Sequence, residues 1–196
     1  MDPIILASTS PRRQEILKSL NIPFIVSPAD IDEDYPSTLE KDKIPEYLAT
    51  KKVEAVIKRF NPEQKIAWVL GADTIVLHKG KVYGKPKDQE EAIQFLTEFQ
   101  GLSHDVITSI ALYNGEKDAI TTCKSVNRVT FAPMSQKEIL WYVDTGEWHG
   151  AAGGYRIQSL ASCFIEKIEG TLSSVMGLPI FELYDILKSQ GYSILE

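Results

Sequence analysis

The sequence has no long apolar runs, few cysteines, and none of the common phosphate-binding motifs. No apolar stretch approaches the roughly 20 residues that span a bilayer, and no charged-then-apolar signal stands at the N-terminus. We therefore expect a cytoplasmic protein without membrane contact. Cys123 and Cys163 form no close pair, which favours free thiols in a reducing cytosol. Neither a Walker A loop nor a Gly-x-Gly-x-x-Gly motif is present, so the usual nucleotide cradles are excluded.

Basic charge is also scarce. The net charge of -6 argues against a broad nucleic-acid surface, and basic residues do not alternate with aromatic ones as such a surface requires. The three histidines (His78, His104 and His149) are scattered along the chain. A histidine or cysteine zinc site is therefore poorly supported, and carboxylates are the better candidates for holding any metal.

The composition and pattern predict a globular α/β protein. A chain of 196 residues, 43% of them hydrophobic, is long enough for one substantial core or two lobes of one. Strands are expected at residues 4–8, 24–26, 66–77, 82–83, 103–113, 119–130 and 162–166. Helices are expected at 11–20, 45–60, 88–99, 135–146 and 180–190, with capping boxes at Asp88/Glu91 and Ser135/Glu138. A hairpin at Asn114-Gly115 excludes a purely parallel sheet, so we predict a mixed twisted sheet with flanking helices.

The segment from Ser8 to Arg13 joins a strand to a helix. Ser10 is placed as the N-cap and Pro11 as the first helical residue, so Arg12 and Arg13 fall in the first turn. Cations oppose the helix dipole there, whereas an anion such as a polyphosphate would be stabilised between the arginines and the helix end. An ordinary strand-turn-helix with solvated arginines explains the segment equally well.

Two acidic features are candidates for chemistry. Asp73 interrupts an apolar run in the segment Gly71-Ala72-Asp73-Thr74, and a buried carboxylate needs a partner, a metal or a cleft. The alternative is a turn or bulge in which Asp73 bonds nearby backbone. The acidic run at residues 30–34 is expected to be mainly a solvated loop. If one of its members reaches Asp73, the two carboxylates could hold Mg²⁺ against a phosphate.

Two lysines and one loop complete the candidates. Lys52 shares the buried side of its helix, so it either snorkels or points into a polar cleft. Lys85 lies in the tight turn Gly84-Lys85-Pro86, where exposed lysines are ordinary. The glycine-rich loop at 150–158 permits close backbone approach, and the Gln158 amide suits the edge of a pyrimidine. A purely structural loop is the alternative.

Taken in order, these segments resemble the Maf family of nucleoside triphosphate pyrophosphatases. The matching segments lie at 6–13, 30–33, 52, 71–74, 84–87, 153–158, 164–170 and 175–179. The resemblance implies a single Maf-like domain over residues 1–196. It also implies a fold like that of the inosine triphosphate pyrophosphatases, with two lobes around a deep cleft.

The resemblance also implies an activity. Water attacks the α-phosphate of a nucleotide, with a divalent cation (Mg²⁺ or Mn²⁺), and releases a monophosphate and pyrophosphate. The segment Tyr155-x-Ile157-Gln158 resembles the branch that acts on dTTP and UTP, and the loop of the 7-methyl-GTP branch is missing. A homodimer is expected by the same resemblance, with no stable nucleic-acid partner.

Residue roles follow from the matched positions. Asp73 is expected to be the catalytic base and to share the metal with Glu33. Lys52 and Lys85 are expected to contribute catalytic cations. The substrate-binding and specificity positions are Arg12, Thr74 and Gln158, together with Ser8, Ser10 and Arg13.

Three positions depart from the branch pattern Lys-Ala-Gly-Ala-Tyr-Gly-Ile-Gln-Gly. Ala151 replaces the lysine, Arg156 the middle glycine and Ser159 the last glycine. Ala151 removes a cation, which Arg156 could restore from another position. The same loss keeps a second hypothesis open, a low-turnover nucleotide-binding regulator linked to cell division and septum formation.

Overall fold

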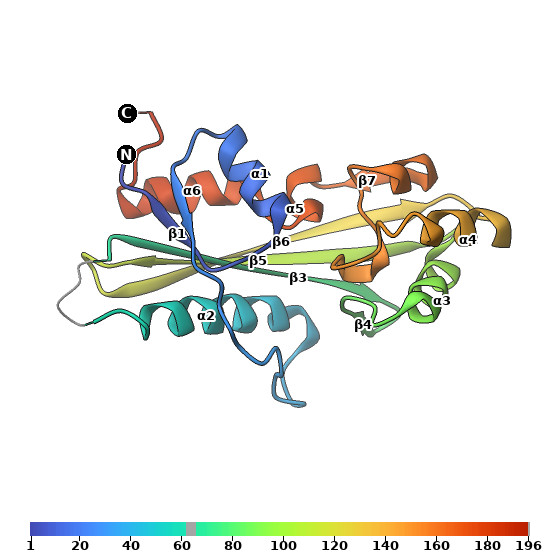
Figure 1. Cartoon of the computed structure of the whole chain (residues 1–196), viewed down its shortest axis with the longest axis horizontal. Helices are drawn as coiled ribbons and strands as arrows, with labels where there is room; N and C mark the ends of the chain where they lie inside the picture. The colour runs from blue at the N-terminus through green and yellow to red at the C-terminus, as the bar shows by residue number, and fades with distance from the viewer. Residues whose placement is uncertain (62–65, 196) are drawn as a thin grey trace. The chain divides into compact units, whose positions relative to one another are not determined.

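A computed structural model describes residues 1–61 and 66–195, and it has a mixed sheet with helices on both faces (Figure 1). The sheet order is β2-β1-β3-β5-β6-β7, with β4 paired to β3. The described strands are β1 (Ile4–Leu6), β2 (Phe24–Val26), β3 (Trp68–His78), β4 (Lys81–Tyr83), β5 (Ser103–Asn114), β6 (Ala119–Phe131) and β7 (Ile165–Glu169). The described α-helices are α1 (Pro11–Ser19), α2 (Ile44–Ile57), α3 (Gln89–Phe99), α4 (Gln136–Asp144), α5 (Leu172–Met176) and α6 (Ile180–Gln190). The predicted fold class is confirmed.

Parallel and antiparallel pairing coexist in this sheet. β1 pairs in parallel with both β2 and β3, where Leu6 lies opposite Leu70. β4 and β7 pair antiparallel with β3 and β6 respectively. β1 ends opposite Leu70, partway along β3, so the segment after Leu6 begins beside the stretch of β3 that carries Asp73.

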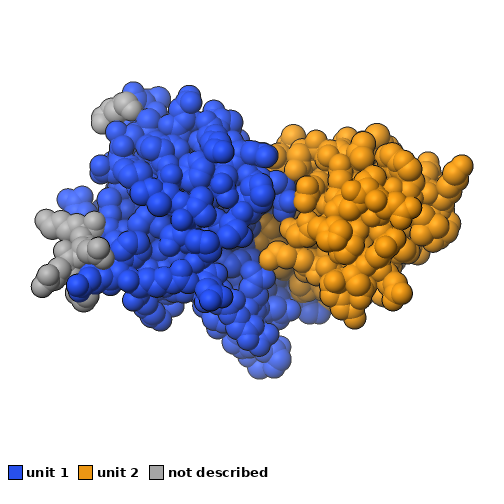
Figure 2. All heavy atoms as spheres, in the orientation of Figure 1, with its two compact units in different colours: residues 1–73, 108–125, 177–196 blue, residues 74–107, 126–176 orange. Residues whose placement is uncertain are grey.

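The chain divides into two compact units (Figure 2). Unit 1 comprises residues 1–73, 108–125 and 177–196, and unit 2 comprises residues 74–107 and 126–176. Each of the three longest strands contributes residues to both units.

Unit 1 has a core of small aliphatic side chains where α2 packs on the sheet. Its buried members are Ala7, Ala49, Val53, Val56, Val69 and Ala111. Figure 1 shows α2 on one face of the sheet and α1 with α6 on the other. Alanine and valine protrude little, so a helix backbone can approach a strand closely.

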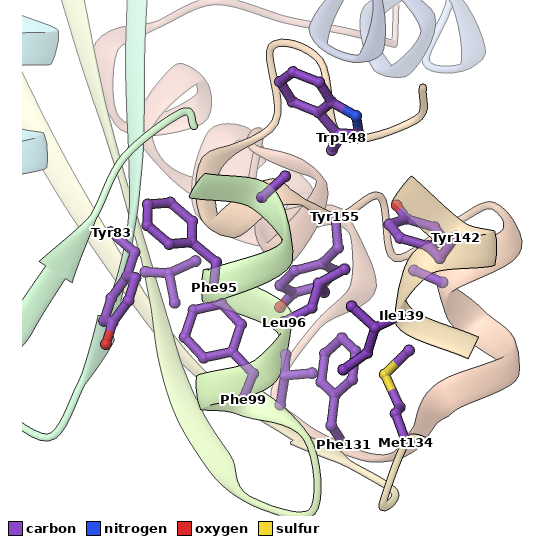
Figure 3. Packing of buried hydrophobic residues seen from close by; sticks show 14 of the residues in the cluster. Tyr83, Phe95, Leu96, Phe99, Phe131, Met134, Ile139, Tyr142, Trp148 and Tyr155 are labelled. Carbon is purple, nitrogen blue, oxygen red and sulfur yellow. The ribbon is translucent and has the colours of Figure 1, made fainter. Parts of the chain in front are cut away.

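Unit 2 has an aromatic core instead. Its buried members include Tyr83, Phe95, Phe99, Phe131, Tyr142, Trp148 and Tyr155, and Figure 3 shows them around α3. The rings meet mostly edge to face, as in Phe131 and Tyr155, whose centroids are 5.0 Å apart at 82°. Such geometry is favoured by the ring quadrupoles.

Several local predictions need correction. A strand was expected at 162–166, but residues 162–164 belong to the 3-10 helix η3 (Leu160–Phe164), and the strand β7 begins after it at Ile165. The turn or bulge considered at Asp73 is wrong, because β3 runs unbroken through it. Asp88 caps α3 as predicted, but the Glu91 carboxylate accepts from the Lys87 N–H rather than completing a capping box.

Two short helical segments were not predicted. These are η1 (Lys41–Lys43) and α5, each too short to show a hydrophobic period. Another 3-10 turn, η2 (Ala152–Gly154), lies in the predicted small-residue loop. Over residues 1–61 and 66–195, no helix has the length and apolarity that a membrane crossing demands.

Candidate functional site

A lysine held between two carboxylates lies in unit 1. The Lys52 ammonium on α2 is 2.6 Å from Oδ1 of Asp73 on β3 and 2.8 Å from Oε1 of Glu33, which lies in the loop after β2. The Lys52 and Asp73 side chains are about one-tenth exposed, whereas that of Glu33 is 45% exposed. Of the two alternatives for Lys52, the polar environment is therefore the one observed.

Gly71 explains why α2 and β3 approach closely enough for this contact. A β-carbon on Gly71 would lie 2.5 Å from the Ala49 carbonyl oxygen and 2.7 Å from Cγ2 of Val53. Alternate residues of a strand share a face, so Gly71 and Asp73 both face α2. Glycine at position 71 thus lets the helix deliver Lys52 to Asp73.

The electrostatic setting of Asp73 combines burial with nearby cations. Burial raises the pKa of the Asp73 carboxyl, and the charge of Glu33 acts in the same direction. The charges of Lys52 and Arg13, and the Lys52 hydrogen bond, lower the pKa but do not cancel the effect of burial. A carboxylate with a raised pKa is a better proton acceptor than a free one.

A second network surrounds Arg13 at the start of α1. The Arg13 guanidinium donates from Nη1 to Oγ of Ser8 (3.0 Å) and from Nε to the carbonyl oxygen of Gly177 (2.8 Å). The Ser8 hydroxyl oxygen also accepts from the N–H of Ser10. Burial lowers the pKa of Arg13, but arginine titrates so far above neutral pH that the group stays cationic.

The beginning of α1 has the predicted arrangement. Ser10 is the N-cap and Pro11 opens the helix, but the Ser10 side chain makes no capping hydrogen bond. Arg12 is partly exposed and Arg13 is buried, so the alternative with two solvated arginines is wrong for Arg13. The first turn contains no acidic residue that would oppose an anion.

The acidic run at 30–34 behaves as predicted for most of its members. Asp32 and Asp34 are exposed, and Oδ1 of Asp32 accepts from the N–H of Asp34. The Lys51 ammonium donates to the carbonyl oxygens of both residues, which anchors the loop. Glu33 is the member that reaches the Lys52 ammonium shared with Asp73.

The carboxylates of Asp73 and Glu33 suit a divalent cation that is also held by substrate phosphates. In the part of the chain that the structure describes, no group of three His, Cys, Asp or Glu side chains could hold a metal. Mg²⁺ is commonly bound by one or two carboxylates together with substrate phosphates. Asp73 and Glu33 fit that pattern. The Lys52 ammonium, which contacts both carboxylates, takes the place of a metal cation between them.

Three predicted site residues belong to unit 2. Thr74 follows Asp73 on β3 and is half-buried, whereas Lys85 and Gln158 are exposed on loops. The two loops are joined within the unit, because the N–H of Gly153 donates to the carbonyl oxygen of Gly84. Unit 2 therefore holds Lys85 and Gln158 on neighbouring loops.

The comparison with known proteins decides the family. A profile described as Maf-like protein matches residues 3–190 of the chain. The chain belongs to the Maf family. The resemblance inferred from the sequence motifs is thereby confirmed, and it covers nearly the whole chain.

Curated Maf relatives match over their full length. A protein of Desulforamulus reducens named dTTP/UTP pyrophosphatase is 43% identical over 100% of both chains. A protein of the same name from Symbiobacterium thermophilum is 42% identical over 99% of this chain and 97% of that one. Among solved structures, the Staphylococcus aureus Ham1 protein matches with a TM-score of 0.54 over 96% of this chain and 100% of that chain, at 14% identity, and so supports the fold alone.

The departures from the Maf branch pattern have local explanations. Ala151 is buried and its methyl side chain is uncharged, so position 151 presents no cation. The Arg156 guanidinium donates to the carbonyl oxygen of His149, and the Ser159 hydroxyl donates to the Glu147 carboxylate. Both new side chains therefore tie the turn that carries Gln158 to the segment 147–149.

Gly177 is the site residue that sequence reasoning missed. Its carbonyl oxygen orients the Arg13 guanidinium, and its backbone has a φ of 108° that favours glycine. The only signal in the sequence was its place in the Maf-like segment 175–179. A backbone acceptor has no side-chain signature, so its role required the structure.

Proposed function

We propose that this Maf protein hydrolyses dTTP and UTP to the nucleoside monophosphate and pyrophosphate. The Lys52–Asp73–Glu33 cluster is the observation that carries the proposal, because it provides a buried carboxylate base beside fixed cations. The names of the full-length relatives support the pyrimidine substrates.

Asp73 is the proposed general base. Its carboxylate would take a proton from the water that attacks the α-phosphorus, and its raised pKa brings it closer to the pH at which the reaction runs. In the nucleotide-free protein, the 2.6 Å contact with the Lys52 ammonium holds this carboxylate in one orientation. Proton transfer of this kind contributes about 10²–10⁴-fold to a rate.

The remaining cations would neutralise the triphosphate. Phosphoryl transfer depends on positioning and charge stabilisation more than on covalent chemistry. Arg12 and the first turn of α1 are proposed to bind phosphate oxygens, with Ser10 beside them. Arg13 is anchored to Ser8 and Gly177, which fixes its charge in place. Lys85 is proposed as a further phosphate-binding cation.

A divalent cation is proposed to join the substrate at Asp73 and Glu33. Mg²⁺ or Mn²⁺ would polarise the phosphate and stabilise the charge on the departing pyrophosphate. The two carboxylates and the phosphates of the nucleotide would hold it, in keeping with the donor set described above.

Base selection is assigned to Thr74 and Gln158, with Arg12. An amide can donate and accept at once, which matches the alternating edge of thymine or uracil. Gln158 is exposed on its turn, and the neighbouring Arg156 and Ser159 hold the backbone on both sides.

The deciding experiment is pyrophosphate release from a panel of canonical and modified triphosphates, with Mg²⁺, with Mn²⁺ and with EDTA. Cation-dependent release from dTTP and UTP is expected, and Asp73→Asn controls for contaminating phosphatases. Release only from other nucleotides would retain the reaction and overturn the base assignment. Tight nucleotide binding without release would instead favour the low-turnover regulator of cell division.

Two further proposals concern the state of the protein. We expect a homodimer, on the Maf resemblance, which light scattering on the purified protein would test. We also expect a cytoplasmic location, which the free Cys123 and Cys163 thiols support, Cys163 being exposed.

A further inference from the structure

Lys52 occupies the point on which the two carboxylates converge. Its ammonium contacts Oδ1 of Asp73 and Oε1 of Glu33 at 2.6 and 2.8 Å. A divalent cation bound by Asp73 and Glu33 would have to share these two carboxylates with the ammonium. The two cations would also repel one another in a largely buried setting, where charges are weakly screened.

Removing the ammonium from the carboxylates requires a new partner for it. Lysine carries three donors on one compact charge and cannot be left buried without an acceptor. Helix α2 packs closely against β3 at Gly71, so the ammonium relocates within the reach of its own side chain. A triphosphate entering beside Asp73 would supply acceptor oxygens and negative charge at that place.

We propose that the Lys52 ammonium holds the divalent-cation position in the nucleotide-free protein, so that the cation binds with the nucleotide and not before it. This inference rests on the proposed function, since it takes Asp73 and Glu33 as the cation ligands. Binding linkage then requires that the cation and the nucleotide strengthen each other's affinity by the same factor.

Lys52→Met tests the proposal because methionine keeps an unbranched stem and removes the charge. Binding of Mn²⁺ alone is measured from the electron paramagnetic resonance signal of the free ion. We expect Lys52→Met to bind Mn²⁺ at least about tenfold more tightly than the wild type, since two carboxylates lose their competing cation. Affinity equal to or weaker than that of the wild type would overturn the proposal.

Lys58→Met is the matched control. Lys58 is exposed at the C-cap of the same helix, so this variant loses the same charge away from the carboxylates. Its Mn²⁺ affinity should equal that of the wild type. An equal gain in Lys58→Met would mean that net charge alone explains the effect, which would contradict the role of Lys52.

The location of the ion is tested by a double variant. Adding Glu33→Gln to Lys52→Met should remove the gain in Mn²⁺ affinity, and retention of the gain would overturn the assignment. Thermal unfolding gives a second readout, in which Mn²⁺ should raise the Tm of Lys52→Met more than that of the wild type. If Lys52→Met fails to fold, Lys52→Gln keeps an amide donor and should show the same direction of change.

A non-hydrolysable dTTP analogue with a methylene between the α- and β-phosphorus atoms tests the binding order. In the wild type, the analogue should tighten Mn²⁺ binding at least about tenfold, and in Lys52→Met this enhancement should shrink. Enhancement of equal size in both proteins would contradict the proposal.

The two hypotheses can fail separately. Pyrophosphate release by the wild type without any gain in Lys52→Met would leave the function intact and reject the role of Lys52. Tighter Mn²⁺ binding by Lys52→Met without release by the wild type would support the role of Lys52 and reject the function.

Discussion

The cores of the two units are built from different kinds of side chain. Unit 1 packs alanine and valine between α2 and the sheet, whereas unit 2 packs tyrosine, phenylalanine and tryptophan around α3. Small side chains bring the helix backbone against Gly71, and this close approach holds Lys52 on a buried carboxylate. Large rings fill space without such an approach, and unit 2 presents two of its candidate residues, Lys85 and Gln158, on surface loops.

The difference affects how strongly the candidate residues of each unit are coupled to folding. Burial perturbs Asp73 in unit 1, where charges lie on rigid elements. In unit 2, Lys85 and Gln158 are exposed, so their substitution should cost little folding free energy. Substitutions of the buried residues of unit 1 should therefore change activity and stability together, whereas those of Lys85 and Gln158 should change activity with little change in stability.

The largest effect is expected from Asp73→Asn. Loss of the proposed base should lower kcat/KM for dTTP at least about 10³-fold, within the range that general-base catalysis supplies. Asparagine has nearly the same shape, so the far-ultraviolet circular dichroism spectrum should not change. A variant that unfolds would indicate a structural rather than a catalytic role for Asp73.

Gly71→Ala should have the next largest effect. The new β-carbon would meet the Ala49 carbonyl and Val53 closely, and overpacking of this kind costs about 1–3 kcal/mol. Gly84→Ala is the matched control, because no atom lies within 4 Å of a β-carbon at that position. Chemical denaturation measures both, and equal free energies of unfolding for the two variants would refute the close-approach argument.

His104 gives unit 2 its own response to pH. Burial in the aromatic core lowers the pKa of His104 to about 3, with the charge of His78 acting in the same direction. At pH values between the ordinary histidine pKa and this lowered value, the His104 imidazole is protonated in the unfolded chain but not in the native state. Stability should therefore fall as pH drops from about 6.5 to about 3, by up to about 1.4 kcal/mol per pH unit.

His104→Phe isolates this contribution. The aromatic ring is retained and the titrating group is lost, together with the 2.7 Å hydrogen bond to the Tyr155 hydroxyl. Denaturation across pH 4–7 should give a shallower slope in the variant, whatever its absolute stability. Identical slopes would show that His104 does not titrate differently in the two states.

Gln158→Ala should have the smallest effect on stability and a selective effect on substrate. The exposed side chain predicts a change below about 0.5 kcal/mol in the free energy of unfolding. The ratio of kcat/KM between dTTP and a purine triphosphate should fall about tenfold, as expected for one lost hydrogen-bonding group. A uniform loss on every triphosphate would contradict its role in base selection.

The sequence predicted most helices and strands because their signals are local, whereas the roles of the site residues remain predictions that follow from the Maf resemblance. Pro11 and Ser10 marked the start of α1, and Ser135 with Glu138 formed the predicted capping box of α4. The buried side of α2 correctly included Lys52. The contacts of Lys52 could not be predicted, because they depend on how closely α2 and β3 pack.

Other features were beyond sequence reasoning for a physical reason. The strand predicted over 66–77 includes Asp73, but the partner that compensates the buried carboxylate there, Lys52, lies on another element and could not be identified from the pattern. The Gly177 carbonyl is a backbone group, and any residue carries one. The family motifs gave the positions of these residues, whereas their interactions came from tertiary structure.

The turn that carries Gln158 has an evolutionary consequence. The turn is held by the hydrogen bonds of the Arg156 and Ser159 side chains, one on each side of position 158. The side chain at 158 takes part in neither hydrogen bond. Mutations at position 158 are therefore nearly free of folding cost. If Gln158 selects the base as proposed, single substitutions there would change the substrate range while the Lys52–Asp73–Glu33 cluster stays unchanged.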